Sequence, residues 1–322
     1  MKEEFQAGDT IDALARHYSD QANAGAFMTA LREWGVTLDE YKSFITKLYP
    51  LVVGFNAGLI RSIAKIDELQ ASVQARELVE EILAVDHIRH SHRVQALAAR
   101  LRTIAREARR PTLRALAAQL KEEQEHNDYY RQMLEVYGID HEAVYSAFET
   151  YLNEIPIEER DRMTREVLIS LQEGHGGNAF PHTSFCQYTL ALHHYLLRAV
   201  NDPSVTFISY NALQCGIEFS LVKVVSESVF PGVAGTRNHP QLNRALVPDA
   251  DLCEVGAVPL SIKWWDEHAD YGQGGRVELQ HVRYGREQLN RNLKEETEVR
   301  ETLQRVDDVI RLSAAAVGAW EM

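Results

Sequence analysis

The chain has 322 residues, of which 45% are hydrophobic and 25% are charged, as in ordinary globular proteins with a sizeable core. Its net charge of -13 argues against a dedicated nucleic-acid binder, which needs a basic face, and against docking on an anionic membrane. We therefore expect no nucleic acid and no membrane among its partners.

The first ten residues and the cysteines indicate the cellular compartment in which we expect the protein. Residues 1–10 lack the basic and then apolar layout of a signal peptide, and no uninterrupted apolar run is long enough to span a bilayer. The three cysteines, Cys186, Cys215 and Cys253, are widely spaced and form no C-x-x-C. They are typical of reduced thiols rather than of a disulfide framework or a zinc site, so we expect a cytoplasmic protein.

Leu, Ala, Glu and Arg recur at helical spacing along the chain, which predicts an all-α protein. The predicted helices cover residues 10–34, 39–66, 71–108, 112–137, 142–152, 158–173, 183–200, 204–229, 259–271 and 276–316. We find no strand pattern and no phosphate-binding glycine loop. We expect one helical domain over residues 1–322, with a core at 37–293, an N-terminal helical extension at 1–36 and a C-terminal helix at 294–322.

Turn residues separate several of these helices. Pro111 indicates a tight hairpin between the helices on its two sides, and Gly138 is typical of a residue just past a helix end. Residues 202–204, Asp-Pro-Ser, can cap the next helix. Residues 231–259 are long for an irregular loop and predict a lid or rim over a site. The charged stretch 293–311 indicates a solvated or oligomer-facing surface, such as that of a homodimer.

Two Glu-x-x-His spacings are the sharpest chemical signal. Glu123 and His126 lie three residues apart on one predicted helix, so both side chains can reach one metal ion, and Glu122 can replace Glu123. Glu278 and His281 repeat the spacing on a later helix. Because two such pairs are little more than the composition gives by chance, ordinary surface pairing remains the alternative for each pair taken alone.

Glu218 changes that balance because it lies in the most apolar helix, with no charged residue between Asp202 and itself. A buried carboxylate without a partner costs several kcal/mol, so we expect it to be protonated, paired with Lys223 or Arg198, or bound to a metal. Together with the two Glu-x-x-His pairs, it favours a metal site. A further ligand can come from another helix, and the candidates are Glu81, Asp86, His90 and His268. Residues 193–194, a His-His pair, look like core histidines, with a proton-shuttle role left open.

At this point a family resemblance emerges. Residues 37–50 resemble the early helix of the haem-oxygenase-like di-iron oxidases, in the superfamily of thiaminase II and pyrroloquinoline-quinone synthase. Residues 122–139, which read E-E-x-x-H and then Y-x-x-M-L-x-x-Y-G-I, are similar to that family's first ligand helix. Glu218 falls where the family has its single middle Glu. The resemblance covers roughly residues 37–293.

The third ligand helix departs from the family pattern, which is H-x-x-x-D-x-x-H. Residues 274–281 read Gly-x-x-x-Glu-x-x-His, so the first imidazole is missing and Glu278 replaces Asp. Either His268 supplies the missing imidazole, or the site has fewer ligands.

The resemblance implies a haem-oxygenase-like helical bundle that holds two Fe(II) ions, or manganese, and uses O2 to oxidise a small molecule by hydrogen abstraction, desaturation, cyclisation or oxygenation. The metal ligands it implies are Glu123, His126, Glu218, Glu278 and His281. Family members often act on amino acids or fatty acids in natural-product biosynthesis. We lean towards a free amino acid, because three side chains near the expected mouth can hold a carboxylate: Arg276, Arg283 and Tyr284.

Two alternatives stay open at this stage. One is a cofactor-free oxidase or hydrolase of the same fold that uses His and Tyr as acid–base groups. The other is a helical binding protein without enzymatic activity.

Overall fold

The structure is a computed structural model, and all the regular structure in its described residues is helical, which confirms the predicted all-α class. The described residues are 7–33, 36–63, 65–66, 77, 100, 103, 111–174, 180, 185–235, 260–269 and 276–318. The predicted helix at 71–108 and most of the predicted loop at 231–259 lie outside these residues.

The first half of the described chain forms α1 (Ala7–Asn23), α2 (Ala26–Glu33), α3 (Leu38–Ile63), α7 (Pro111–Val136), α8 (His141–Glu154) and α9 (Ile157–Gln172). The second half forms α10 (Gln187–Asn201), α11 (Phe207–Val224), the π-helical turn η1 (Val225–Val229), α12 (Phe230–Gly235), α14 (Leu260–His268), α15 (Arg276–Asn292) and α16 (Glu296–Gly318).

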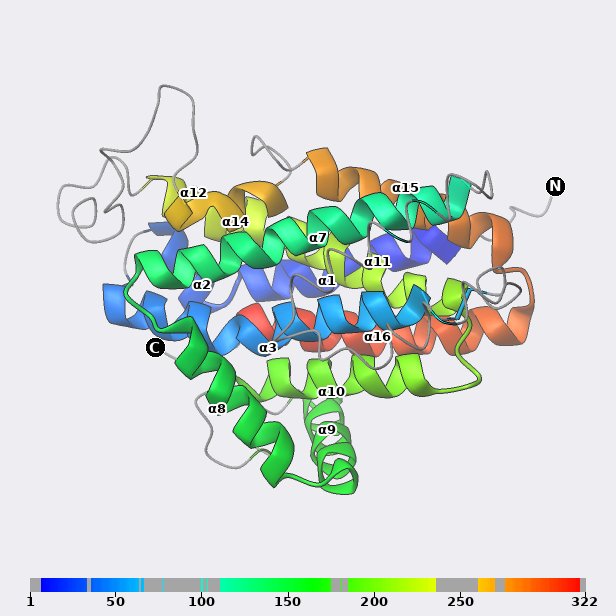
Figure 1. The fold of residues 1–322 in the computed structure, drawn as a ribbon, viewed down its shortest axis with the longest axis horizontal. Helices are drawn as coiled ribbons and strands as arrows, with labels where there is room; N and C mark the ends of the chain where they lie inside the picture. Colours follow the sequence, from blue (N-terminus) through cyan, green and yellow to red (C-terminus); the bar gives the residue numbers. More distant parts are fainter. Residues whose placement is uncertain are drawn as a thin grey trace.

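The long helices lie side by side along the long axis of the molecule, while α8 and α9 project away from them (Figure 1). Helix α3 packs against α7 and α10, and α11 packs against α1, α15 and α16. One continuous hydrophobic cluster joins these helices. The bundle therefore holds polar side chains of different helices in an environment from which water is largely excluded.

Both terminal helices belong to this core. On α1, Ile11 and Ala15 are fully buried, and on α16, Val306 and Val309 are fully buried. The solvated surface predicted at residues 293–311 is therefore confined to one side of the stretch. Charged residues cover one side of α16, but its valine stripe packs against α11 and α1.

Two of the predicted helices are interrupted. The helix predicted at 10–34 breaks at residues 24–25, where Gly25 packs so closely on Gly318 that a Cβ atom would lie 2.6 Å from the Gly318 carbonyl oxygen. The helix predicted at 276–316 breaks at residues 293–295. The break contains neither Pro nor Gly, and Leu293 is buried there against Ala7 and Val299.

The local turn signals have mixed outcomes. Gly138 follows α7 with a φ of 69°, and the Ile139 N–H donates to the Leu134 carbonyl, as in a glycine-terminated helix. Pro111 is the first residue of α7. The capping prediction for residues 202–204 is wrong, because the side chain of Thr206 accepts from the Ser209 N–H and caps α11.

The stretch Leu38–Ser62 of α3 is long and apolar enough to cross a membrane by composition, although none of its uninterrupted apolar runs is long enough to do so alone. Of its most apolar window, 78% is buried inside the bundle. This burial is typical of a core helix, and the apolar face of α3 forms one wall of the site described next.

Candidate metal centre

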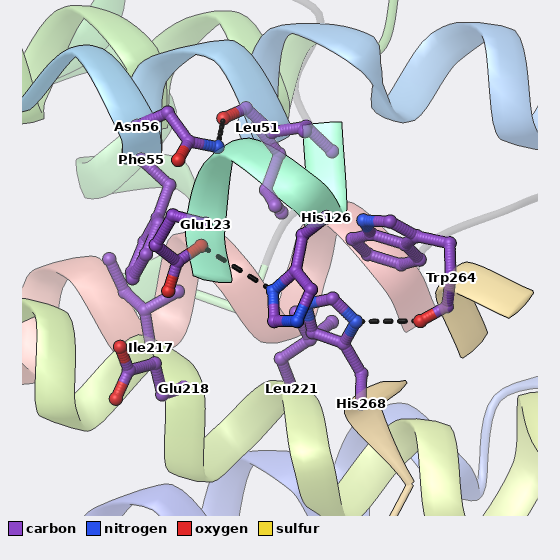
Figure 2. Close-up of a pocket in the computed structure, with 11 residues that line it drawn as sticks. Leu51, Phe55, Asn56, Glu123, His126, Ile217, Glu218, Leu221, Trp264 and His268 are labelled. Atoms are coloured by element: carbon purple, nitrogen blue, oxygen red, sulfur yellow. Dashed lines mark hydrogen bonds and ion pairs between the residues drawn. The ribbon is translucent and has the colours of Figure 1, made fainter. Parts of the chain in front are cut away.

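A cluster of buried acids and imidazoles lies where α7, α11, α14 and α15 meet. Glu123 of α7 and Glu218 of α11 lie on one side of the cluster, and the ring of His126 of α7 lies beside that of His268 of α14 (Figure 2). The four side chains are each at least nine-tenths buried. Their burial is unusual, because charged and imidazole groups seldom enter a core without partners or a metal.

Three ligand-type atoms converge in this cluster. One atom each of Glu123, Glu218 and His281 lies within 4.8 Å of the other two, so the three groups could hold one metal ion. They come from three different helices, and Glu123 and Glu218 are separated by nearly a hundred residues of chain. The structure thus brings together three of the residues singled out in the sequence, and Glu218 does not point to bulk solvent.

The two oxygens of Glu123 face two different imidazoles. Its Oε2 atom lies 3.7 Å from Nδ1 of His126, and its Oε1 atom lies 3.9 Å from Nδ1 of His281. A carboxylate placed in this way can bridge two metal ions, which in dinuclear sites lie about 3.5–4 Å apart. Glu123 thus lies between two imidazoles that come from different helices.

Two histidines of the cluster each donate one ring N–H to an acceptor. Nε2 of His281 lies 2.7 Å from the Glu122 carboxylate, and Nδ1 of His268 lies 2.7 Å from the Trp264 carbonyl oxygen. In a neutral imidazole the other ring nitrogen carries the lone pair, which is Nδ1 for His281 and Nε2 for His268. Metal-binding histidines usually donate their second N–H to a carboxylate or a carbonyl in this way. Glu122 and Glu123 therefore have different places. Glu123 is one of the three converging residues, whereas Glu122 contacts His281 and is not one of them.

Glu218 is held by an amide rather than by the cations considered from the sequence. Gln119 of α7 donates from Nε2 to Glu218 Oε1 over 3.1 Å. Lys223 pairs instead with Asp20 and Glu227, and Arg198 pairs with Asp161. The two proposed ion pairs for Glu218 are therefore wrong.

A small cavity of about 20 Å³ lies beside these groups and has room for about one water-sized molecule. Its apolar wall consists of side chains from α3 and α11, namely Leu51, Val52, Phe55, Ile217 and Leu221. Asn56 lines the same cavity, and its amide nitrogen donates to the Val52 carbonyl and to Asn127. No Lys or Arg is among the described residues that line it.

No protein-family model, curated protein or solved structure matches this chain. The resemblance to the haem-oxygenase-like di-iron oxidases therefore stays a prediction from short motifs.

Cys215 lies one helical turn before Glu218 on α11, and its thiol donates to the Val282 carbonyl over 3.4 Å. Burial, with a smaller contribution from the Glu218 charge, raises the pKa of the Cys215 thiol. Cys215 therefore stays a protonated thiol that packs α11 against α15. Both described cysteines, Cys186 and Cys215, are free thiols, and Cys253 lies outside the described residues.

The remaining candidates are placed differently. Arg283 points to solvent, with 83% of its side chain exposed and Nε 3.7 Å from a Glu287 oxygen, so it does not line the cavity. The side chains of Arg276, Glu278 and Tyr284 lie outside the described part of the structure, as do residues 81–92, which include Glu81, Asp86 and His90. His193 and His194 are buried, as predicted for core histidines.

Sequence reasoning missed two residues of the site. Asn56 had a signal, because it is the only polar side chain between Leu51 and Ile60 in a strongly apolar helix. Gln119 had none, because an amide in a helix of mixed composition is ordinary. Only the approach of α11 makes Gln119 a partner of a buried carboxylate.

Proposed function

We propose that this protein is an oxygen-dependent oxidoreductase that holds two ferrous ions and oxidises a small molecule. The observation that carries the proposal is the position of Glu123, whose two oxygens face the imidazoles of His126 and His281 beside the buried Glu218. Lys223 and Arg198, the two cations considered for Glu218 from the sequence, pair with other carboxylates instead.

The donor set fits iron. Carboxylates and imidazoles suit Fe(II) or Mn(II), whereas the one cysteine beside the cluster is a protonated thiol. Glu123, Glu218 and His281 would hold one ion. Glu123 and His126, whose Oε2 and Nδ1 atoms lie 3.7 Å apart, would contribute to holding the other. When bound, two ferrous ions supply electrons for the reduction of O2.

The chain's own groups prepare the site for such chemistry. The Trp264 carbonyl and Glu122 orient the two imidazoles, and Gln119 holds one oxygen of Glu218 so that the other can bind metal. The apolar side chains of α3 and α11 exclude water from the reacting side. The cavity suits a diatomic molecule, so an organic substrate must displace part of this wall.

We propose a small-molecule substrate without naming its chemical class. The preference for a free amino acid depended on Arg276, Arg283 and Tyr284, and Arg283 points away from the cavity. The apolar wall would instead accept an aliphatic part of the substrate next to the metal.

Anaerobic loading with ferrous iron tests the proposal. The protein is loaded, desalted and analysed for iron, in parallel with Glu218→Gln and with the control Glu227→Gln, a carboxylate on the solvent side of the same helical stretch. We expect about two ions per chain for the unchanged protein and the control, and at most one for Glu218→Gln.

Two results would overturn the proposal. Absence of bound iron would favour a cofactor-free enzyme or a binding protein, and equal iron in Glu218→Gln would place the metal elsewhere. If iron binds as expected, exposure of the loaded protein to air should consume O2 faster than the same amount of iron with the Glu218→Gln variant.

A further inference from the structure

A second group of buried polar atoms lies between α8, α9 and α10. Tyr151 Oη, Thr164 Oγ1, His193 Nδ1 and Arg160 Nε are all buried and have no hydrogen-bond partner in the described part of the chain. Tyr151, Thr164 and His193 are each at least nine-tenths buried. Native proteins leave few buried polar atoms unpaired, and a concentration of them indicates a bound water or ion.

These atoms share one neighbourhood. The ring of Phe148 contacts both aromatic partners, with its centroid 6.1 Å from that of Tyr151 and 4.9 Å from that of His193. Arg160 and Thr164 lie one turn apart on α9, which packs along α10. Asp161, which follows Arg160, lies 2.7 Å from Nε2 of His194, which follows His193, so α9 and α10 approach each other at this level.

No carboxylate of the described residues forms an ion pair with Arg160, because the acidic residues near it on α9 pair with other side chains. Asp161 pairs with His194 and Arg198. Glu159 and Glu166 both pair with Arg162 on the exposed side of α9. None of these three carboxylates is therefore left to pair with the buried Nε atom of Arg160.

Every side chain of the group can donate a hydrogen bond. A guanidinium and two hydroxyls can all donate, and either imidazole nitrogen can donate when protonated. No carboxylate of the described chain contributes to the group. Arginine with neutral donors is the typical environment of a carboxylate or phosphate oxygen.

From these contacts we infer that Arg160, Tyr151, Thr164 and His193 form a binding site for an oxyanion, the carboxylate or phosphate group of a small molecule. None of these residues lines the cavity of the metal centre. The site is therefore separate from the proposed oxidase chemistry and does not depend on it.

Thermal unfolding in the presence of simple anions tests the site. Full-length protein without added metal is titrated with inorganic phosphate and, separately, with acetate, at an ionic strength held constant with potassium chloride. The variants are Arg160→Gln and Thr164→Val, with Arg165→Gln as the matched control, because Arg165 is an exposed arginine on the same helix.

We expect a saturable rise in Tm for the unchanged protein and for Arg165→Gln, because an anion that binds only the folded chain stabilises it. Arg160→Gln should need at least about tenfold more anion for the same rise, a loss expected from removing a charged donor. Saturation at lower phosphate than acetate identifies a phosphate ligand, and the reverse order identifies a carboxylate.

Two outcomes would overturn the site. One is the absence of a saturable rise with either anion, which would leave buried water as the partner of these atoms. The other is an equal midpoint for the unchanged protein and Arg160→Gln. If Arg160→Gln does not fold, Thr164→Val carries the same test, because it removes a donor without removing a charge.

Discussion

Helix α3 contacts two buried polar clusters of opposite character. On one side, Leu51 and Phe55 face the metal centre, whose groups are carboxylates and imidazoles with lone pairs. On the other side, Gly54 packs against His193 of a cluster whose guanidinium and hydroxyl groups can donate. A bound cation would stabilise the first arrangement and a bound anion the second, because burying several groups of the same character together is costly.

The largest effect should follow from Glu123→Gln. Because Glu123 faces both imidazoles, its loss should remove both ions, whereas Glu218→Gln should remove only one. We expect iron affinity to fall by more than about 100-fold, beyond the loss seen when an outer partner is removed. Iron analysis after anaerobic loading measures this, with Glu135→Gln on the same helix as the control. Retention of one ion by Glu123→Gln would show that Glu123 does not bridge.

A strong effect of pH on stability should arise in the group formed by Arg160, Tyr151, Thr164 and His193, called the donor cluster below. Burial, with the charges of Arg160, His194 and Arg61, lowers the pKa of His193 to about 3. The unfolded chain takes up this proton near pH 6.5, so the contribution of neutral His193 is fully present above that pH and is lost as pH falls towards 3. The slope should be about 1.4 kcal/mol per pH unit.

Urea unfolding between about pH 6.5 and about pH 4 measures this slope. His193→Gln should flatten it, while His17→Gln, which changes an exposed histidine, should not. Phosphate or acetate should also reduce the slope, because an anion favours protonated His193. The same slope in His193→Gln as in the unchanged protein would contradict the prediction.

An intermediate effect should follow from Gln119→Leu. This change removes the N–H that holds Glu218, and loss of such a partner typically weakens metal binding by about 10- to 100-fold. Competition with a ferrous chelator measures the affinity, and Gln119→Glu should weaken binding as well by placing a like charge beside Glu218. The control Gln280→Leu changes an exposed side chain next to His281. Equal affinities in Gln119→Leu and the control would remove Gln119 from the site.

The smallest effect should follow from Arg283→Gln. The side chain is 83% exposed and contacts only a glutamate of its own helix, so iron content and thermal stability should stay unchanged. Once a substrate is known, its KM should also stay the same. A raised KM would restore Arg283 to the substrate-binding role suggested by the sequence.

The sequence alone determined the helical class, the stop at Gly138 and the residues worth following in the metal centre. These features depend on spacing within one or two helical turns, which is encoded locally. Glu123 and His126 share a face because they are three residues apart, and Glu218 stands out because no charge precedes it in its helix.

Only the tertiary structure decided which of these groups meet. The choice of Glu123 over Glu122, the partner of Gln119 and the hydrogen on His268 all depend on helices that are distant in sequence. The breaks at residues 24–25 and 293–295 arise in the same way, from the contact of Gly25 with Gly318 and the burial of Leu293. The donor cluster gave no local signal, because an unpaired polar atom becomes costly only after neighbouring helices have removed its water.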